Sequence, residues 1–502
     1  MARRLALWLL VAWAVACGGG CGAHAPLAIG DALPALAPLR MALEPDAHAE
    51  ELIGWLQAYL RVDTQNPPGN ETAGARWMAG LLEREGIASE IVEFAPGRGS
   101  LIARLPATAT SATTGERPLC LLSHIDTVTS EIAKWPADSG PLSGVRKGGE
   151  IWGRGALDMK GMGILELAVM VHLKRRAVPL RREVILLAVA DEEVDNLGMK
   201  HLVAQHWDRI GCSHLLNEGG IAIEDALAPG QTFFAISVAE KGLLWLKLTA
   251  HGKSGHGSTP IPGRAPDRLL DALAKVRALA PPTQIHPSLY ASFAAAGRDV
   301  GGVVGFVLQR PSLVDLLAVS DLRAEPGTRA AIENTCQITG FSGMFAPNVV
   351  PSEVSAQLDC RLLPGVAPRA FLAELQRAIG DPAVHFTVIH EAAATESPMD
   401  DPLFRTLLRH APGLGPRVVA GPVLSVGFTD SIYVRPLGVR AYGFVPLQVS
   451  RALAETMHGE RERVPEATFV RGLGVLWRVI IDAAAAPPAA GASGAAAAAM
   501  AN

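Results

Sequence analysis

The stretch PLCLLSHIDTV, residues 118–128, has the composition of a buried strand and guides the interpretation of the chain around it. Its apolar run ends abruptly in His124 and Asp126, two positions apart. On an extended strand, side chains at positions i and i+2 point to the same side. We therefore expect these two polar side chains to lie next to each other where the strand leaves the core.

Helical and strand-like segments alternate on both sides of this stretch. Strand-like runs also occur at 88–94, 100–105 and 182–190, and apolar residues recur at helical spacing in 48–62, 71–86 and 161–175. Strands that alternate with helices are typical of an α/β domain. The sequence therefore predicts a mostly parallel central sheet flanked by helices.

The pattern changes near Phe234, where strands and one helix follow one another without the earlier rhythm. We interpret this change as the start of an inserted α+β domain. The predicted organisation is a first domain built from 45–239 and 365–482, with 240–364 inserted between the two parts. The Ala-rich, low-complexity end, 483–502, predicts a disordered tail.

The N-terminus, residues 1–22, has the pattern of an export signal. Arg3 and Arg4 precede an apolar run, Leu5–Ala16, that is too short to span a bilayer comfortably and is followed by small residues. The ending AVAC at Cys17 also resembles a bacterial lipoprotein signal, and an uncleaved anchor helix is the alternative. We expect an exported protein that is periplasmic, secreted, or tethered to a membrane through Cys17.

Length and charge exclude some classes of function. A chain of 502 residues is too long for one ordinary core, which favours two or three domains. The formal net charge of −4 and the pI near 6.4 leave no basic footprint for nucleic acid. We therefore expect no nucleic-acid partner.

Four cysteines lie outside the N-terminal segment, and none forms a Cys-x-x-Cys motif. They are Cys120, Cys212, Cys336 and Cys360. This spacing is neither that of a disulfide-rich scaffold nor that of a cysteine zinc site. One bridge in an oxidising compartment and four small buried hydrophobic residues are both compatible with it, and we favour the second interpretation.

Acidic residues recur where predicted strands stop. Glu192 and Glu193 follow the apolar run that ends at Ala190, Glu218 closes the segment CSHLLNEGG, and Asp158 lies between a Gly-rich turn and a helix start. In an open α/β sheet, ligands bind beyond the carboxyl ends of the strands. We therefore expect six side chains to converge there: His124, Asp126, Asp158, Glu192, Glu193 and Glu218.

Such a group of carboxylates indicates a metal. Carboxylates in one cleft repel one another and raise each other's pKa unless a cation neutralises them. Imidazole and carboxylate ligands without thiolates suit Zn²⁺, with Mn²⁺ and Co²⁺ as competitors. Five or six ligands are too many for one tetrahedral ion that keeps a position open, whereas two ions that share a carboxylate would use them all.

Each of these residues also has a simpler explanation when it is taken alone. Asp158 could cap the following helix, Glu192 and Glu193 could belong to a solvated loop, and the segment 124–126 could be a turn. The repetition of acids at strand ends favours the metal hypothesis.

Six motifs together resemble one enzyme family. SHIDTV, GRGALDMKG, ADEEVDNLGMKHL, LLNEGG, GKSGHGSTP and MHGERERVP are similar, in order and spacing, to the motifs of the two-zinc metallopeptidases. That family includes aminoacylase, carboxypeptidase G, carnosinase and succinyl-diaminopimelate desuccinylase, and the resemblance spans about residues 50–480. The long segment 283–345 is similar to the larger branch of carboxypeptidase S and N-fatty-acyl-amino-acid hydrolases.

The resemblance implies a role for each residue of the metal motifs. The implied ligands of two Zn²⁺ ions are His124, Asp158, Glu193, Glu218 and His458, with Asp158 bridging the ions. Glu192 matches the general base. Asp126 matches a carboxylate that orients the ligand His124, and its alternative role is that of a ligand.

The resemblance also implies that the inserted domain is a lid that mediates dimerisation. His256 matches a lid histidine that reaches the scissile carbonyl, commonly that of the partner subunit, and Asn348 and Arg361 match residues that bind the substrate. Gly427 and Thr429 resemble a loop that helps to hold the same carboxylate. A salt bridge of Arg361 to Asp359 or Glu353 is the alternative role for that side chain.

The implied activity is zinc-dependent hydrolysis of an amide bond next to a free α-carboxylate, in an N-acyl-amino acid or a small peptide. Metal-activated water would attack with Glu192 as general base. A dipeptidase or deacetylase of the same fold, and a non-catalytic protein that binds metal or amino acids, are the alternatives. The apolar segments 300–309 and 313–319 would form lid core, which we favour, or line a groove for an acyl chain.

Overall fold

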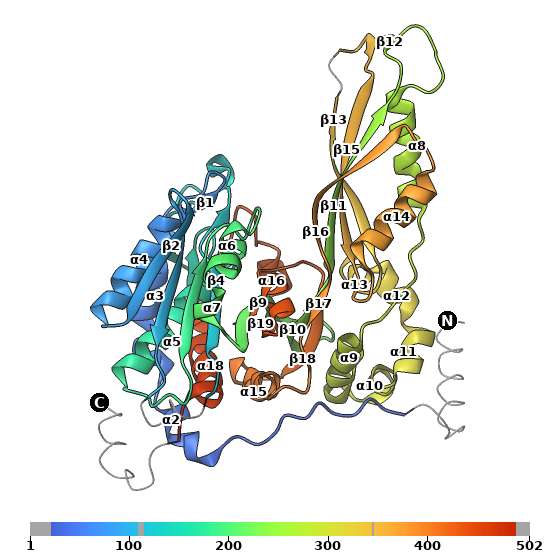
Figure 1. Ribbon diagram of the computed structural model, residues 1–502. Helices are drawn as coiled ribbons and strands as arrows, with labels where there is room; N and C mark the ends of the chain where they lie inside the picture. The colour runs from blue at the N-terminus through green and yellow to red at the C-terminus, as the bar shows by residue number, and fades with distance from the viewer. Residues whose placement is uncertain (1–21, 109–114, 344–345, 488–502) are drawn as a thin grey trace.

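The computed structural model describes residues 22–108, 115–343 and 346–487. It consists of an α/β domain, hereafter the catalytic domain, and a narrow lid that projects from it (Figure 1). The predicted signal and Cys17 lie outside the described residues, except for Gly22. Within the described ranges, no helix is both long and apolar enough to cross a membrane.

The catalytic domain is built on a nine-stranded sheet with the order β17-β10-β19-β9-β4-β8-β3-β2, in which β18 also pairs with β10. The strands are β2 (Ala88–Ala95), β3 (Arg98–Leu105), β4 (Leu119–His124), β8 (Val184–Val189), β9 (His214–Glu224), β10 (Thr232–Glu240), β17 (Thr395–Glu396), β18 (Val418–Ser425) and β19 (Arg440–Val449). The central pairs β8–β4, β4–β9 and β9–β19 are parallel, and β2–β3 and β3–β8 at one edge are antiparallel. The predicted α/β fold with a mostly parallel central sheet is confirmed.

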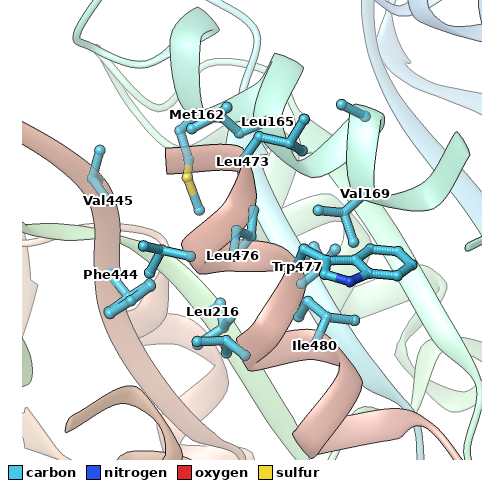
Figure 2. Close-up of a cluster of buried hydrophobic side chains, with 14 of the residues drawn as sticks. Met162, Leu165, Val169, Leu216, Phe444, Val445, Leu473, Leu476, Trp477 and Ile480 are labelled. Atoms are coloured by element: carbon cyan, nitrogen blue, oxygen red, sulfur yellow. The ribbon is translucent and has the colours of Figure 1, made fainter. Parts of the chain in front are cut away.

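Helices cover both faces of this sheet, which explains why every residue of β8 and the first four residues of β4 are apolar and buried. Alternate residues of β4 enter different cores: Leu121 packs with one group of helices and Leu122 with the other. The first group includes α3 (Ala49–Leu60), α4 (Glu71–Arg84), α5 (Lys160–Arg175) and α18 (Glu466–Ala484), and the second includes α6 (Leu197–Gln205), α7 (Trp207–Ile210) and α16 (Ser431–Val434). Figure 2 shows the contact of α18 with α5, where Trp477 lies among Leu165, Val169 and Ile480.

The lid is a separate four-stranded antiparallel sheet with the order β13-β15-β11-β16. Its strands are β11 (Gly242–His251), β13 (Thr335–Ser342), β15 (Glu353–Leu362) and β16 (Val384–Ala392), and α8 (Ala265–Ala278) and α14 (Pro368–Ile379) cover one face. The separate lid domain is thus confirmed as part of the fold. The predicted return to the catalytic domain at residue 365 is too early, because the apolar face of α14, with Phe371 and Leu375, packs on the lid strands and β16 pairs with β11.

A helical segment between the lid strands lies beside the edge of the catalytic sheet. It comprises α9 (Pro287–Val300), α10 (Gly302–Leu308), α11 (Pro311–Leu317), α12 (Val319–Ala324) and α13 (Pro326–Ile332). Ser292 on α9 donates a hydrogen bond of 2.5 Å to the carbonyl of Pro422 on β18. Among the described residues, the lid core includes none from 300–319, and Val304 and Leu316 are 61% and 65% exposed. The favoured interpretation of these segments as lid core is therefore wrong.

Short elements complete the chain. They are α2 (Ala37–Met41), α15 (Pro402–His410), α17 (Arg451–Ala454), β1 (Gln65–Asn66), β5 (Thr127–Val128), β6 (Val145–Lys147), β7 (Glu150–Trp152), β12 (Gly255–His256), β14 (Val349–Val350), β20 (Arg463–Pro465) and the 3₁₀ helices η1 (Pro34–Leu36), η2 (Pro45–His48), η4 (Ile132–Lys134), η5 (Ala411–Leu414) and η6 (Arg435–Leu437). The predicted tail begins too early, because α18 continues to Ala484 and the buried Ala485 pairs with Leu180. Residues 488–502 lie outside the described ranges.

The four cysteines form two disulfides, Cys120–Cys212 and Cys336–Cys360. The first pair joins β4 to the segment that enters the neighbouring β9, and the second joins residues that face each other across β13 and β15. The favoured interpretation as free buried cysteines is wrong, because the adjacent strands bring residues distant in sequence side by side. Two disulfides indicate an oxidising environment.

Candidate metal centre

The candidate centre lies where β4 and β8 end. These strands are parallel, so their carboxyl ends meet at the same rim of the sheet. His124 is the last residue of β4, and Glu192 and Glu193 follow the end of β8. The strand endings therefore place these three side chains together.

Glu218 reaches the same rim in a different way. The prediction that its strand stops there is wrong, because β9 continues to Glu224. The pairing of β4 with β9 ends at Leu121 and Leu216, so Glu218 lies just beyond the point where the two strands part. One of its carboxylate oxygens is 3.8 Å from Nε2 of His124.

Asp158 connects two groups of potential ligands. Its Oδ1 lies 3.1 Å from Nε2 of His124, and its Oδ2 lies 3.1 Å from Nε2 of His458. His458 is also 3.3 Å from Oε2 of Glu193. The two imidazoles thus face different oxygens of one carboxylate, which is the arrangement needed for a carboxylate shared by two ions.

Bringing these acidic side chains together shifts the pKa values of the glutamates. Burial, followed by the charge of a neighbouring carboxylate, raises the pKa of Glu192, Glu193 and Glu218. The pKa of His458 is also raised, to about 10, because hydrogen bonds to Asp158 and Glu193 stabilise its charged form. The cluster therefore favours positive charge in its midst.

The residues present fit a pair of metal ions. Three or more donor atoms approach one another within 4.8 Å in two groups around His124, one with Asp158 and Glu193 and one with Glu192 and Glu218. Within the described part of the chain, Oε1 of Glu193 is buried without a hydrogen-bond partner. Imidazoles and carboxylates without thiolates are suitable ligands for Zn²⁺.

Asp126 has different partners from those predicted. His124 Nδ1 bonds to the backbone carbonyl of Asp126 at 2.9 Å, whereas the carboxylate is 3.6 Å from the ring nitrogen. The carboxylate instead accepts hydrogen bonds from the backbone amides of Glu192 and Glu193, at 3.0 and 3.1 Å, and from Asn66 Nδ2 at 3.0 Å. The bond to the carbonyl places a proton on Nδ1 of His124, so that Nε2 is the nitrogen that could bind a metal, and the carboxylate fixes the two glutamates.

Glu462 supports the loop that carries Asp158, a role that sequence reasoning missed. Its buried carboxylate accepts hydrogen bonds from the amides of Gly155, Leu157 and Asp158 at 2.8–3.0 Å, and from Nη1 of Arg154 at 2.8 Å. In the sequence, Glu462 is one of several charged residues in GERERV, and only its spacing of four from His458 distinguishes it.

The structure leaves two of the predicted substrate-binding residues far from this centre. His256 on β12 and Asn348 before β14 lie together at the lid tip, where the amide of Gly257 donates to the carbonyl of Asn348 at 2.8 Å. Figure 1 shows β12 at the end of the lid that points away from the catalytic domain. One chain therefore does not bring His256 to its own metal centre.

Arg361 lies instead at the base of the lid, near the predicted loop 427–429. Its Nε and Nη2 donate to the carboxylate of Asp359 at 2.7 and 3.0 Å, so the salt bridge weighed as an alternative is present. Its guanidinium carbon lies 5.0 Å from the ring centre of Phe428.

Within the loop 427–429, Gly427 is half-buried and the side chain of Thr429 is fully engaged. The Thr429 hydroxyl donates to Glu240 at 2.8 Å and accepts from Asn217 at 3.1 Å. Contact of this loop with a substrate would therefore involve its backbone.

Comparison with known proteins supports one family. Residues 120–482 match the model of peptidase family M20/M25/M40. The chain is 26% identical over 376 residues to the N-fatty-acyl-amino acid synthase/hydrolase PM20D1 of Homo sapiens, which covers 73% of this chain and 74% of that protein. It is also 26% identical over 430 residues to aminoacylase-1 of Sus scrofa, covering 84% of this chain and 92% of that protein.

Comparison with solved structures finds a similar fold in the same family. The crystal structure of an M20 family metallo-carboxypeptidase from Sulfolobus solfataricus superposes with a TM-score of 0.63 at 18% identity, over 86% of this chain and 98% of that one. The family match, the fold and the convergent carboxylates and imidazoles agree. The chain belongs to peptidase family M20/M25/M40 and is a hydrolase of the metallopeptidase and aminoacylase type.

Proposed function

We propose that this protein hydrolyses the amide bond of a small N-acyl-amino acid or peptide next to a free α-carboxylate, with two Zn²⁺ ions per subunit. The observation that carries the proposal is the position of Asp158, whose two oxygens face the imidazoles of His124 and His458. The names of the relatives, an N-fatty-acyl-amino acid synthase/hydrolase and an aminoacylase, support the substrate class.

The contacts divide the proposed ligands into two sets. His124, Asp158 and Glu218 would hold one ion, and Asp158, Glu193 and His458 the other. When bound, a zinc pair would lower the pKa of a coordinated water and polarise the substrate carbonyl. Co²⁺ and Mn²⁺ are the expected substitutes because they accept the same donor set.

Glu192 is the proposed general base. Burial and the nearby Glu218 raise its pKa above the ordinary value, which makes this carboxylate a better proton acceptor. Its backbone amide donates to Asp126, so the position of the base is fixed by a buried residue. Glu192 would take the proton from the attacking water and return it to the leaving amine.

Substrate binding is assigned to the lid and to the loop 427–429. Arg361 and the backbone around Thr429 would hold the free carboxylate, and Asn348, which lies with His256 at the lid tip, would reach it from the other subunit of a dimer. The place of His256 at the lid tip supports a homodimer through the lid, in which His256 of one subunit stabilises the oxyanion formed in the other. Export, with or without a lipid tether at Cys17, remains part of the proposal.

A hydrolysis panel tests the proposed function. Zinc-loaded protein is incubated with N-acetyl-amino acids, N-long-chain-acyl-amino acids and dipeptides, with and without a chelator. We expect hydrolysis of at least one class, its loss with chelator, and its recovery after Zn²⁺, Co²⁺ or Mn²⁺ is added back. Chelator-insensitive hydrolysis would remove the metal mechanism, and preference for dipeptides would favour a dipeptidase.

A further inference from the structure

The base of the lid presents one open face of its sheet to the catalytic domain. Leu244, Leu246 and Leu248 of β11 point into the lid core under α8 and α14. The intervening positions point to the opposite face, because side chains alternate along a strand. Trp245 occupies this open face of β11 and pairs in register with His390 of β16.

Aromatic rings from both domains meet at this face. The ring centre of Trp245 lies 6.0 Å from that of His390 and 6.4 Å from that of Phe428, and His390 lies 6.5 Å from Phe428. Tyr433 joins them through its hydroxyl, 3.2 Å from Nε2 of His390. We refer to Trp245, His390, Phe428 and Tyr433 as the aromatic cluster.

Two buried hydrogen-bond donors border the aromatic cluster and lack a partner within the described ranges of the chain. They are Nη1 of Arg361 and Nε1 of Trp245. Asp359 orients the Arg361 guanidinium through its other nitrogens, and the guanidinium carbon lies 5.0 Å from the Phe428 ring centre and 6.0 Å from that of Trp245. A buried donor without an acceptor is destabilising, so a ligand with an acceptor would stabilise both groups.

The aromatic cluster is connected to the metal centre. The Tyr433 hydroxyl lies 3.5 Å from Oδ1 of Asn196, whose Nδ2 donates to Asp430 at 3.1 Å. Phe428 is also adjacent in sequence to Thr429, whose hydroxyl accepts a hydrogen bond of 3.1 Å from Asn217, the neighbour of the proposed ligand Glu218. A substrate that spans a few bonds from the metal centre would thus reach the cluster.

We propose that the aromatic cluster is the specificity site for the amino-acid side chain, and that it selects large apolar side chains, aromatic ones above all. This inference rests on the proposed function. The carboxylate of the substrate would accept hydrogen bonds from Arg361 Nη1 and Trp245 Nε1, while its side chain packs on the rings.

The charges around the cluster disfavour other substrates. An acidic side chain would meet the buried Asp430 and the carboxylate of Asp359. A basic side chain would meet Arg361 and Lys200, whose ammonium lies 5.5 Å from the Tyr433 ring centre. A small side chain would leave the rings uncovered, so it would gain less from burial.

Competition kinetics test this inference. For the N-acetyl derivatives of Phe, Leu, Ala, Glu and Lys, we expect the wild type to have the highest kcat/KM with Phe and Leu. Phe428→Leu and Trp245→Ala should lower the Phe-to-Ala ratio of kcat/KM by about tenfold or more. Trp245→Phe keeps a ring and removes one donor, so it should raise KM for all five substrates and preserve the ratio.

Phe306→Ala is the matched control. Phe306 on α10 also stacks with an arginine, because the guanidinium carbon of Arg310 lies 3.5 Å from its ring centre. It should leave the ratio unchanged, and thermal unfolding of each variant excludes misfolded protein. Equal losses for Phe and Ala substrates in Phe428→Leu would overturn the inference, as would a wild-type preference for Ala, Glu or Lys. If the wild type hydrolyses no N-acyl-amino acid or peptide, the proposed function itself fails, which is a separate result.

Discussion

The metal centre and the lid tip each contain residues from the motifs that identify the family. They differ in whether one chain brings these residues to the same site. His124, Asp158 and Glu218 come from segments distant in sequence, yet they lie within hydrogen-bond or near-contact distance at one rim. His256 and Asn348 also lie together, but at the exposed end of the lid. The first set is assembled by one chain, and the second has no target within that chain.

The difference shows which kind of geometry strand topology determines. Parallel strands end at a common rim, so residues that follow β4 and β8 meet regardless of the length of chain between them. The lid is connected to the catalytic domain at Lys241–Gly242 and at Ala392–Thr395, and the helices α9–α13 between its strands also contact that domain through β18. The strand order of the catalytic sheet therefore does not determine where the lid tip lies.

The largest expected effect concerns the rim. Glu192→Ala should lower kcat by on the order of 10³–10⁴-fold, because it removes the proposed base while the metal ligands remain. Zinc content per chain should stay near that of the wild type. The adjacent Glu193→Ala is the matched control and should lose zinc, since Glu193 contacts His458. Metal analysis and kinetics of both variants check this, and wild-type activity in Glu192→Ala would show that the base is another residue.

The second effect concerns the lid tip. His256→Ala should lower kcat by on the order of 10²–10³-fold if this histidine stabilises the oxyanion. Mixing this variant with Glu192→Ala should restore activity, because a mixed dimer then contains one complete site.

Equal mixing should recover roughly a quarter of wild-type activity, since about half of the dimers are mixed and each has one working site of two. Activity measured after co-refolding, with the separate variants as controls, gives the result. No recovery, together with a loss of activity in His256→Ala alone, would mean that the lid closes onto its own chain.

The third effect concerns the loop that carries Asp158. Glu462→Gln should weaken zinc binding by about 10–100-fold, because the substituted amide cannot accept hydrogen bonds from all the backbone amides that the carboxylate holds. The buried Arg154 also loses its charge partner, which typically costs about 3–5 kcal/mol of the free energy of unfolding. Chelator competition and chemical denaturation measure the two losses.

Glu460→Gln, two residues away in the same loop, is the control and should change neither quantity. Wild-type zinc affinity in Glu462→Gln would mean that the loop holds its shape without this carboxylate.

The sequence allowed the α/β fold to be predicted because periodicity and composition report burial directly. The strands β4 and β8 are buried on both faces, and accordingly all residues of β8 and the first four of β4 are apolar. The end of the lid was placed too early, because the amphipathic pattern of α14 indicates a helix but not the sheet on which it packs. The pairing of Cys120 with Cys212 was missed for a similar reason, since it depends on which strands become neighbours.

Within the centre, the polar residues were predicted but some of their contacts were not. The pair of His124 and Asp126 was expected to interact through side chains, yet the backbone carbonyl makes the bond. A spacing of two residues places side chains on one face but does not say which acceptor is nearer. Glu462 was missed because it lies among other charged residues, and its spacing of four from His458 does not by itself indicate burial.

The disulfide between Cys120 and Cys212 has a consequence for where this protein can become functional. The two cysteines are 92 positions apart, and the segment between them includes His124, Asp158, Glu192 and Glu193. Closing a ring of that size removes chain entropy worth about 4–5 kcal/mol from the unfolded state. In a compartment that kept these thiols reduced, the chain would lack this contribution. The compartment that oxidises them therefore also favours the fold that brings together three of the five proposed metal ligands, His124, Asp158 and Glu193.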